Sequence, residues 1–423
     1  MIRFYNGKVL KMDGSLDITN EEVWVKGSEI CYVGSTPDEL PEFEREIDLK
    51  GDLLMPGFKN AHTHSGMTFL RSYADDLPLN EWLFNKVFPL EDKLTPDYIY
   101  WLTKLAIMEY LTSGITASFD MYFFRRMYAK ANIECGFRTV ICPGINDFTA
   151  DMQDVEDEYL ELKNYHPLIS YKLACHAEYT TKLDRLKEIR DLLHKYKEPF
   201  FVHNSETLSE VQGCIERHGK TPTELFEDLG MYEYGGGGFH CVYMSDNDLD
   251  IFKKHGLWAV TNPGSNCKLA SGIAPITKYL DKGINIAIGT DGPASNNALD
   301  MFREMYLVSV LQKILNNDAA SCDAGKVLEM ATVGGARAMG LDNCDSIAVG
   351  KQADLIIIDL SRPNMHPLNN ITKNIVYSGS KENVRMTMVA GKVLYEKGEF
   401  FIGVEPHIVY ENSNRIVREI VEG

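Results

Sequence analysis

The sequence predicts an α/β protein, a (β/α)8 barrel that carries a small β-sandwich domain built from both ends of the chain. The middle of the chain alternates apolar, strand-like runs with longer helical patterns, whereas both ends consist of short strand-like runs separated by Gly, Asp and Pro. With 423 residues, the chain is long enough for one large domain and an appendage. The predicted division is 1–54 for the N-terminal part of the β-domain, 55–348 for the barrel, and 349–423 for the C-terminal part of the β-domain and a tail.

Eight apolar runs mark the predicted barrel strands. Strands that are buried on both faces lose their alternating polarity, as in INIAIG at 284–289. A helix is predicted over Asp97–Ser113, because Thr95 can cap it, Pro96 suits its first turn and Gly114 follows its end. The eight strand-then-helix units fit a TIM-like barrel better than an open doubly wound sheet, since no Gly-rich dinucleotide fingerprint follows the first strand. The runs are Leu53–Ala61, Ile115–Asp120, Phe137–Cys142, Ile169–Cys175, Pro199–Val202, Gly238–Val242, Leu257–Thr261 and Ile284–Gly289.

Short strands are predicted in the first fifty residues and again near the C-terminus, as in a small antiparallel sheet. Neither end alone offers many strands, so we expect the two ends to assemble into one domain. The expected strands are Ile2–Tyr5, Val9–Met12, Glu22–Lys26, Ile30–Val33, Asp354–Asp359, Val384–Val389 and Lys392–Tyr395.

Composition excludes several classes of partner. The formal charge of −18 argues against binding to nucleic-acid phosphate or to an anionic membrane surface. Nine cysteines are scattered singly, which indicates reduced thiols rather than a disulfide framework. No apolar stretch is long enough to span a bilayer, and charges interrupt the N-terminal segment as they would not in a signal peptide. We therefore expect a cytoplasmic protein that acts on a small molecule.

Candidate metal ligands stand at the C-terminal ends of the predicted strands, where barrel enzymes place their active sites. His62 and His64 end the first run, and because side chains two apart on a strand share a face, both imidazoles can reach one ion. His203 ends the fifth run and Asp291 ends the eighth. Imidazole and carboxylate are the ligands of a catalytic Zn²⁺ that keeps a position open for water. We therefore predict one divalent metal ion held by these four residues, with zinc favoured and iron(II) as the alternative.

Two further residues at strand ends are candidates for proton transfer. Glu206 lies three residues after His203, so it can sit beside a metal-activated water without being forced to ligate, which suits a proton shuttle. His240 ends the sixth run and could hydrogen-bond the nucleophile, while Asp291 could accept a proton from the water as well as hold the metal. Structural alternatives stay open: Glu206 as a helix-start carboxylate favoured by the dipole, and His240 as a satisfied structural histidine.

These strand-end residues carry a resemblance to a known family. With H-x-H on the first strand, H-x-x-E on the fifth, His on the sixth and Asp on the eighth, the chain resembles the amidohydrolase superfamily over essentially its whole length. Three segments are similar to those of the methylthioadenosine/S-adenosylhomocysteine deaminases: MTFLRSYADDLPLNEWLFNKVFPLE at 67–91, NPGSNCKL at 262–269 and TDGPASNN at 290–297. The H-x-x-E pair is that of the mononuclear deaminase branch, in which the glutamate hands a proton to a ring nitrogen.

The resemblance implies hydrolytic deamination of an adenosine-like nucleoside to the inosine analogue and ammonia. It implies attack of activated water on C6 of the adenine ring, with Glu206 protonating N1. It also implies that Glu91 hydrogen-bonds the ribose hydroxyls, that Trp82 packs near the 5′ side and that His176 contacts the purine. From the residues alone, Glu91 could instead be an acid at a helix start and Trp82 an ordinary core residue.

Two features bear on the substrate. The fourth strand ends in Ala-Cys-His-Ala-Glu at 174–178 where the relatives usually have a G-P-H-S-type turn, and Glu178 is expected to add a carboxylate near the purine. The segment Pro143–Tyr159 contains no Arg or Lys, although the carboxylate of S-adenosylhomocysteine would normally be met by arginine. We therefore expect adenosine, 5′-deoxyadenosine or methylthioadenosine to be preferred. The acids of this segment are Asp147, Asp151, Asp154, Glu156, Asp157 and Glu158.

Other functions stay open from the sequence. Guanine-type deaminases and triazine hydrolases share the metal scaffold but have little use for a ribose-binding carboxylate. A binuclear cyclic amidase would need a carboxylated lysine at the end of the fourth strand, whereas Lys172 lies four residues before that end and His176 stands at it. A non-catalytic barrel that serves as an interaction protein is the third alternative. We expect a homo-oligomer, because long barrels of this family often associate.

Overall fold

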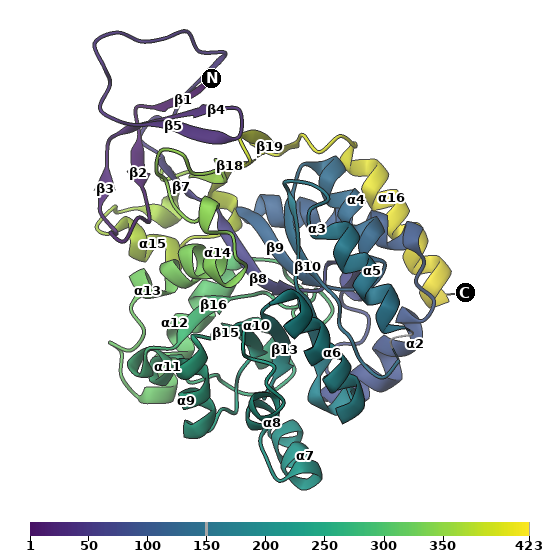
Figure 1. The fold of residues 1–423 in the computed structure, drawn as a ribbon. Coiled ribbons are helices and arrows are strands. Elements are labelled where there is room, and N and C mark those ends of the chain that lie inside the picture. The colour runs from purple at the N-terminus through teal and green to yellow at the C-terminus, as the bar shows by residue number, and fades with distance from the viewer. Residues whose placement is uncertain (149–150, 423) are drawn as a thin grey trace.

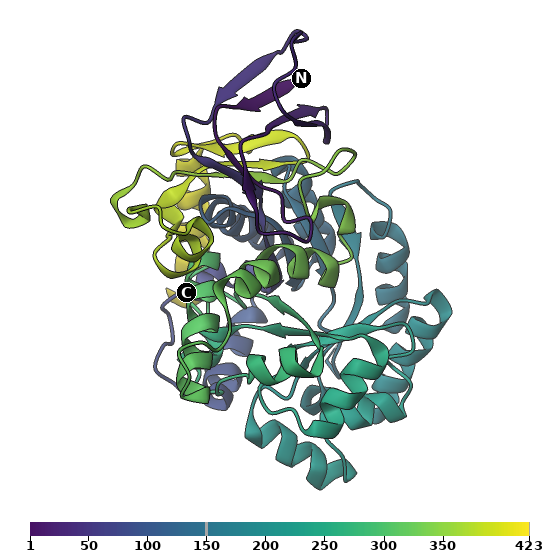
Figure 2. The ribbon, with the colours of Figure 1, turned by 90° about the vertical axis from the view of Figure 1, so that its left-hand side faces the viewer.

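The computed structural model describes residues 1–148 and 151–422. Parallel strands and helices alternate through the middle of the chain, and strands from both ends lie together at one end of the molecule (Figures 1 and 2). The α/β architecture predicted from the sequence is confirmed. In the described part of the chain, no helix is both long and apolar enough to cross a membrane.

Two parallel sheets surround the centre of the barrel, in the orders β11-β10-β9-β8 and β12-β13-β14-β15-β16. β11 and β12 are halves of one predicted strand, interrupted at Lys172, and the sheets meet there through a parallel bridge between Ile145 and Cys175. At the other junction, the amide of Asp291 donates to the carbonyl of His62 at 3.0 Å, which joins the end of β16 to β8. The strands are β8 (Phe58–Thr63), β9 (Ile115–Met121), β10 (Arg138–Cys142), β11 (Ile169–Tyr171), β12 (Leu173–Ala177), β13 (Phe200–Asn204), β14 (Gly236–His240), β15 (Trp258–Thr261) and β16 (Asn285–Ile288).

Helices cover the outer face of these strands (Figure 1). The capping predicted for the first of them is confirmed: the Thr95 hydroxyl accepts the amide of Tyr98, Pro96 is the first residue, and Gly114 turns left-handed at φ 73° just beyond the end. The helices that follow the strands are α3 (Pro96–Thr112), α4 (Arg125–Cys135), α5 (Met152–Leu162), α6 (Leu183–Tyr196), α7 (Leu208–His218), α8 (Pro222–Asp228), α9 (Asp246–His255), α10 (Pro263–Lys268), α11 (Ile276–Lys282), α12 (Met301–Asn316) and α13 (Ala324–Glu329).

The inside of the barrel is a packed core rather than a channel. Phe119, Phe201 and Phe239 from three of the strands contact one another edge-to-face or stacked, with ring centroids 4.9 to 5.8 Å apart. Helix α14 (Gly335–Ala338) packs beneath them against β8. A side chain at Gly335 would place its Cβ 2.8 Å from the Cβ of Lys59, so glycine permits this close approach.

The predicted first strand, Leu53–Ala61, is two strands. β7 (Leu53–Pro56) pairs with β17 (Leu355–Ile358) in the β-domain, and β8 begins at Phe58 in the barrel. The break falls at Gly57, where a Cβ would lie 2.1 Å from the Thr116 side chain. The sequence does not show this change of sheet, because both strands are buried on both faces and read as one apolar run.

The β-domain is a sandwich of two sheets, with orders β5-β4-β1-β6 and β20-β19-β18-β17-β7-β2-β3. Phe4 and Val23 from one sheet share a core with Ile357 and Met386 from the other. The expectation of a purely antiparallel arrangement is wrong, because β1 pairs with β6, and β2 with β7, in parallel. The remaining strands are β1 (Ile2–Tyr5), β2 (Lys8–Leu10), β3 (Ile18–Thr19), β4 (Glu22–Lys26), β5 (Glu29–Gly34), β6 (Arg45–Asp48), β18 (Val384–Val389), β19 (Lys392–Glu396) and β20 (Glu399–Phe400).

The C-terminal segment returns to the barrel after the β-domain. Helix α15 (Ile371–Tyr377) packs against α12 and α13, and α16 (Pro406–Val417) packs against α3, as its yellow ribbon shows in Figure 1. Beyond α16, the Tyr98 hydroxyl donates to the Glu419 carboxylate at 2.7 Å. The last helix therefore tethers the chain end to the outside of the first barrel helix.

A buried ion cluster joins the β-domain to the barrel. Asp354, just before β17, accepts hydrogen bonds from both Nε and Nη2 of Arg138 from β10 at 2.7 and 3.0 Å. The ammonium of Lys59 from β8 lies 3.9 Å from the same carboxylate and donates to the Thr116 hydroxyl at 2.6 Å. Both side chains of the closest pair are almost fully buried, so each charge depends on the other for solvation.

Replacing Asp354 with Asn should therefore cost about 3–5 kcal/mol of unfolding free energy, because it leaves two buried cations without a counter-charge. Urea unfolding followed by circular dichroism measures the loss. Asp246→Asn is the matched control: its ion pairs with Lys278 and Lys282 are exposed, and removing them should cost about 0–1 kcal/mol. Equal losses of unfolding free energy in the two variants would contradict a stabilising role for the buried cluster.

Candidate functional site

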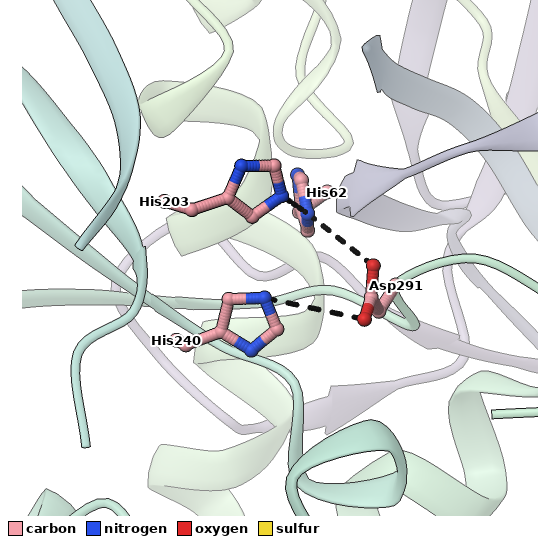
Figure 3. Close-up of side chains that lie close together, drawn as sticks. All are labelled: His62, His203, His240 and Asp291. Atoms are coloured by element: carbon pink, nitrogen blue, oxygen red, sulfur yellow. Dashed lines mark hydrogen bonds and ion pairs between the residues drawn. The ribbon is translucent and has the colours of Figure 1, made fainter. Parts of the chain in front are cut away.

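Four histidines and one aspartate converge at the C-terminal ends of the barrel strands. Ligand atoms of His62, His203, His240 and Asp291 all lie within 4.8 Å of one another (Figure 3). His64 belongs to the same group, since its Nε2 lies 3.2 Å from Asp291 Oδ1 and 3.4 Å from His203 Nε2. All five side chains are buried. The structure thus brings together the four residues predicted to hold a metal, with His240 beside them.

The orientation of the imidazoles fits a divalent cation at their centre. The Nδ1 atoms of His64 and His203 lie 2.6 and 2.7 Å from the backbone carbonyls of Met121 and His176, so each Nδ1 carries the proton and donates it. Each Nε2 then directs a lone pair inward, and the Nε2 atoms of His62 and His203 are only 3.1 Å apart. Converging lone pairs repel one another unless a cation lies between them. The donor set therefore fits a metal ion, with the backbone carbonyls fixing the tautomers.

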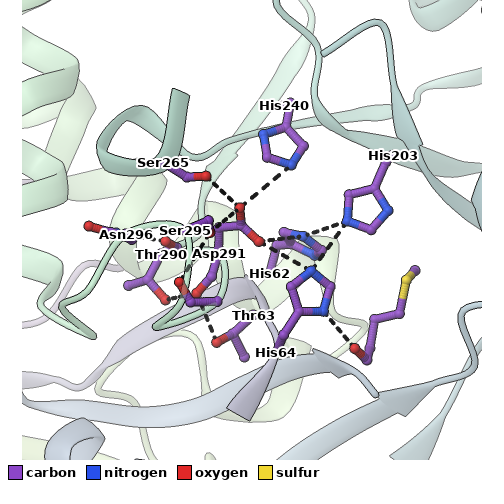
Figure 4. A network of polar contacts seen from close by, with 12 residues as sticks. His62, Thr63, His64, His203, His240, Ser265, Thr290, Asp291, Ser295 and Asn296 are labelled. Carbon is purple, nitrogen blue, oxygen red and sulfur yellow. Dashed lines mark hydrogen bonds and ion pairs between the residues drawn. The ribbon is translucent and has the colours of Figure 1, made fainter. Parts of the chain in front are cut away.

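Asp291 supplies the negative charge of the cluster. Its Oδ2 accepts the hydroxyls of Ser265 at 2.6 Å and Ser295 at 2.8 Å, while its Oδ1 faces the histidine rings (Figure 4). Burial alone would raise the pKa of Asp291, but the His62 and His64 rings that face its Oδ1 hold it well below its usual range. The carboxylate is thus charged and oriented for binding a cation.

The backbone around this cluster is strained at three strand ends. Ser205, His240, Cys241 and Asp291 all have positive φ, at 54°, 70°, 49° and 58°. Non-glycine residues avoid this region at a cost of about 1–3 kcal/mol each, and such conformations persist where the surroundings over-determine them. Here the turns aim side chains from β13, β14 and β16 back toward one point.

Glu206 follows β13 and faces the same pocket from beside the metal cluster. Its Oε2 lies 3.9 Å from His240 Nε2, and its Oε1 accepts the Ser271 hydroxyl at 2.9 Å. Thr207, not Glu206, is the N-cap of α7. The buried position of the Glu206 side chain therefore differs from that of a solvated acid at a helix start. His240 in turn has its Nδ1 2.7 Å from Asn266 Oδ1, which leaves its Nε2 directed into the site.

A pocket of about 780 Å³, counting the space at its mouth, opens over the cluster. Glu91, at the end of α2 (Phe88–Glu91), lines it and accepts the Tyr122 hydroxyl at 2.6 Å. Burial raises the pKa of Glu91 to about 7. Trp82, at the end of α1 (Leu79–Trp82), and His176, in β12, also line the pocket, so the three residues expected to contact substrate share one cavity with the metal cluster.

The structure contradicts the expectation about Glu178 and agrees with the expectation that Lys172 is not a metal ligand. Glu178 does not approach the purine side; it is absent from the pocket lining and forms ion pairs with Arg217 and, at 3.1 Å, His218. Its side chain turns away because a short 3-10 helix (Glu178–Thr180) follows β12 directly. Lys172 lies between β11 and β12, with its ammonium 3.6 Å from Glu198, and does not reach the metal cluster.

The acidic segment 143–159 also differs from expectation, apart from residues 149 and 150, which lie outside the described part. Four of its acids belong to α5, and two of these pair with neighbouring helices rather than with the pocket: Glu156 contacts Lys195 at 2.5 Å, and Glu158 contacts Arg125. Asp147 caps the backbone of Lys182. Gly144 and Asn146 are the residues of this segment that line the pocket among those described. Among the described residues, the acids of this segment therefore do not set the charge of the pocket wall.

Several polar residues that support the site were not assigned roles from the sequence. Ser265, Asn266 and Ser295 hold Asp291 and His240, and Tyr122 holds Glu91. The first three lie in the segments NPGSNCKL and TDGPASNN, whose likeness to deaminases was the signal that could have found them. No comparable signal marks Tyr122, since its partner is distant in the sequence.

Comparison with known proteins agrees with this geometry. The model of the amidohydrolase family matches residues 53–394. The chain is 40% identical over 421 residues to the 5-methylthioadenosine/S-adenosylhomocysteine deaminase of Caldanaerobacter subterraneus subsp. tengcongensis, covering 97% of this chain and 96% of that protein. It is 36% identical to the 5′-deoxyadenosine deaminase of Methanopyrus kandleri, with 90% of each covered.

A solved structure extends the likeness to the whole fold. The zinc-bound adenosine deaminase of Xanthomonas campestris superposes with a TM-score of 0.94 at 32% identity, covering 100% of this chain and 99% of that one. The shared length and the matching family model confirm the resemblance seen in the strand-end residues. The chain belongs to the amidohydrolase family.

Proposed function

We propose that this enzyme removes the 6-amino group from adenosine-like nucleosides by hydrolysis, releasing ammonia and the inosine analogue. The observation that carries the proposal is one pocket in which Glu206, a cluster fit for a divalent metal, and the buried Glu91 face the same space. The relatives at 36–40% identity carry names of deaminases of this substrate class.

We assign the metal to His62, His64, His203 and Asp291, and name zinc as the ion, with iron(II) as the alternative. The zinc held by the Xanthomonas campestris relative supports this choice. When bound, a divalent ion would lower the pKa of a water molecule toward 7 and place positive charge at the reacting centre. The ligand atom of His240 also lies within 4.8 Å of those of His62, His203 and Asp291; we leave it outside the ligand set because its Nε2 lies 3.9 Å from Glu206, beside the proposed proton donor.

Three side chains then carry the protons. Asp291 accepts a proton from the attacking water, and Glu206 delivers one to N1 of the adenine ring, which makes C6 more electrophilic. In its protonated form His240 donates from both ring nitrogens, so that Nδ1 holds Asn266 Oδ1 and the inward Nε2 donates a hydrogen bond to the attacking oxygen. The new bond joins this oxygen to C6. Asp291 passes the proton from the water to the amino group, the C6–nitrogen bond breaks and ammonia leaves, while the hydroxyl proton at C6 returns to Glu206 and a carbonyl is left at C6.

The nucleoside is held by pocket residues outside the metal cluster. We assign the ribose hydroxyls to the buried carboxylate of Glu91, the purine to His176 and the 5′ side to Trp82. Burial lowers the pKa of His176 to about 4, so its ring is neutral and can share a hydrogen bond with a base. The alternative function, hydrolysis of a free base or a triazine, would leave the Glu91 carboxylate buried without a donor from the ligand.

Ammonia release from adenosine by the purified, metal-loaded protein tests the proposal. We expect turnover with about one metal ion per chain, complete loss on chelation, and recovery when zinc is returned. Glu206→Gln should bind the metal normally but lower kcat by about 10²–10⁴-fold, because the proton donor to N1 is lost. Faster turnover of guanine or a triazine than of any nucleoside would favour the alternative function, and two metal ions per chain would favour a binuclear amidase.

Glu91→Gln should lower kcat/KM for adenosine by about tenfold or more, because a neutral amide replaces a charged acceptor of the ribose hydroxyls. In the unmodified enzyme, KM for adenosine should fall as the pH rises through about 7, since the ionised Glu91 is the better acceptor. Steady-state kinetics across this range measure both effects. Adenine, which has no ribose, is the control substrate, and an equal loss on adenine would remove Glu91 from ribose binding.

Methylthioadenosine should be preferred to S-adenosylhomocysteine by at least about tenfold in kcat/KM, because an unmatched carboxylate loses charge-assisted hydrogen bonds. Among the described residues, the pocket wall contains no Arg or Lys, and Arg125 nearby is paired with Glu158. An uncharged 5′-alkylthio analogue of similar length separates charge from size. If the analogue and S-adenosylhomocysteine react equally slowly, length and not charge sets the preference; comparable rates for all three would contradict the proposal.

A further inference from the structure

Two residues outside the pocket lining hold Glu206, one at its carboxylate and one at its backbone. Its Oε1 accepts the Ser271 hydroxyl at 2.9 Å, and its amide donates to the Glu210 carboxylate at 2.8 Å. We propose that Ser271 and Glu210 are positioning residues, which set the direction in which Glu206 presents its carboxylate to the substrate. The inference rests on the proposed function, in which Glu206 transfers the proton to the adenine ring.

Glu210 holds a turn that the chain would otherwise avoid. Ser205 has a φ of 54°, and its amide and that of Glu206 donate to the two oxygens of Glu210 at 2.9 and 2.8 Å. The carbonyl of Ser205 accepts the amides of Val242 and Tyr243 at 3.0 and 2.9 Å. The peptide groups of the strained turn are therefore satisfied from both sides, which is the over-determination that such a conformation requires.

A capping role accounts for only part of what Glu210 does. It lies in the first turn of α7 with the T-x-x-E spacing of a capping box, and the N-cap Thr207 accepts its amide, but its two oxygens accept the amides of Ser205 and Glu206, which precede the N-cap. The Glu210 side chain is 6% exposed and points back to the turn rather than to water. Burial, and next the neighbouring Glu206, raise the pKa of Glu210 to about 7, so the carboxylate is kept there against an electrostatic cost.

Ser271 connects the orientation of Glu206 to that of His240. It lies in a loop after α10, flanked by left-handed Ala270 and Gly272, at φ 54° and 135°. The amide of Ser271 donates to the carbonyl of Asn266 at 2.9 Å, and the side chain of Asn266 holds His240. Helix α10 and the loop that follows it thus orient both side chains that are proposed to work on the substrate beside the metal. A serine that only filled space would not need to donate its hydroxyl to the Glu206 carboxylate, as Ser271 does.

Four variants test the inference in the metal-loaded enzyme. Ser271→Ala and Glu210→Gln should lower kcat per bound metal by about ten- to a hundredfold, with KM for adenosine changed by less than about threefold, because substrate still binds while the proton donor is misplaced. Ser271→Thr keeps the hydroxyl and should recover most of kcat. Glu210→Asp, which is shorter by one methylene, should fall between the Gln variant and the unmodified enzyme.

Matched controls separate positioning from stability. Ser309 is a buried serine that donates to the Cys322 carbonyl, and Asp248 is a buried carboxylate that accepts the Ser245 amide; neither lines the pocket. Ser309→Ala and Asp248→Asn should lower the thermal midpoint without changing kcat per bound metal. The inference is overturned if Ser271→Ala and Glu210→Gln behave like these controls, or if they raise KM alone. Failure of the unmodified enzyme to deaminate nucleosides would instead reject the proposed function.

Discussion

Burial of a charged aspartate among four imidazoles is the constraint on which the rest of the site depends. Asp291 is 5% exposed, and an unpaired carboxylate at that depth would be neutralised by protonation. It stays charged because Ser265 and Ser295 donate to one oxygen while the histidine rings face the other. The strand ends and the segments that directly follow them must therefore bring these groups to one point, and a ring of parallel strands holds such segments together at one end.

The left-handed turns follow from the same constraint. A strand that simply continued beyond Ser205, His240 or Asp291 would carry the next side chains away from the centre. The turns cost conformational energy at three places. Hydrogen bonds to buried peptide groups, such as the one from the Ser205 amide to Glu210, offset this cost. Non-glycine residues with positive φ are thus concentrated at the site, as expected where side-chain geometry serves the chemistry rather than stability.

The sequence predicted those parts of the site that depend on strand geometry. His62 and His64 could be paired because residues two apart on a strand share a face, and residues at parallel strand ends meet at the same edge. The direction of Glu178 could not be predicted, because it depends on a short helical turn and on an arginine 39 residues away. The change of sheet at Gly57 was equally hidden, since only the packing of Thr116 against it requires the break.

The two halves of the pocket are built from different kinds of element, and this has a consequence for specificity. The metal-facing residues sit on strand ends that backbone hydrogen bonds hold in register. Trp82, Glu91 and Tyr122 come from segments that follow strands, where changes of length and side chain disturb the barrel least. Glu91 is held in the protein by one hydroxyl, and among the described residues no hydrogen bond ties it to the five residues of the metal cluster; its link to them is a charge interaction with His64. Within such a scaffold, the wall that selects the substrate can change while the hydrogen bonds that hold Asp291 stay in place.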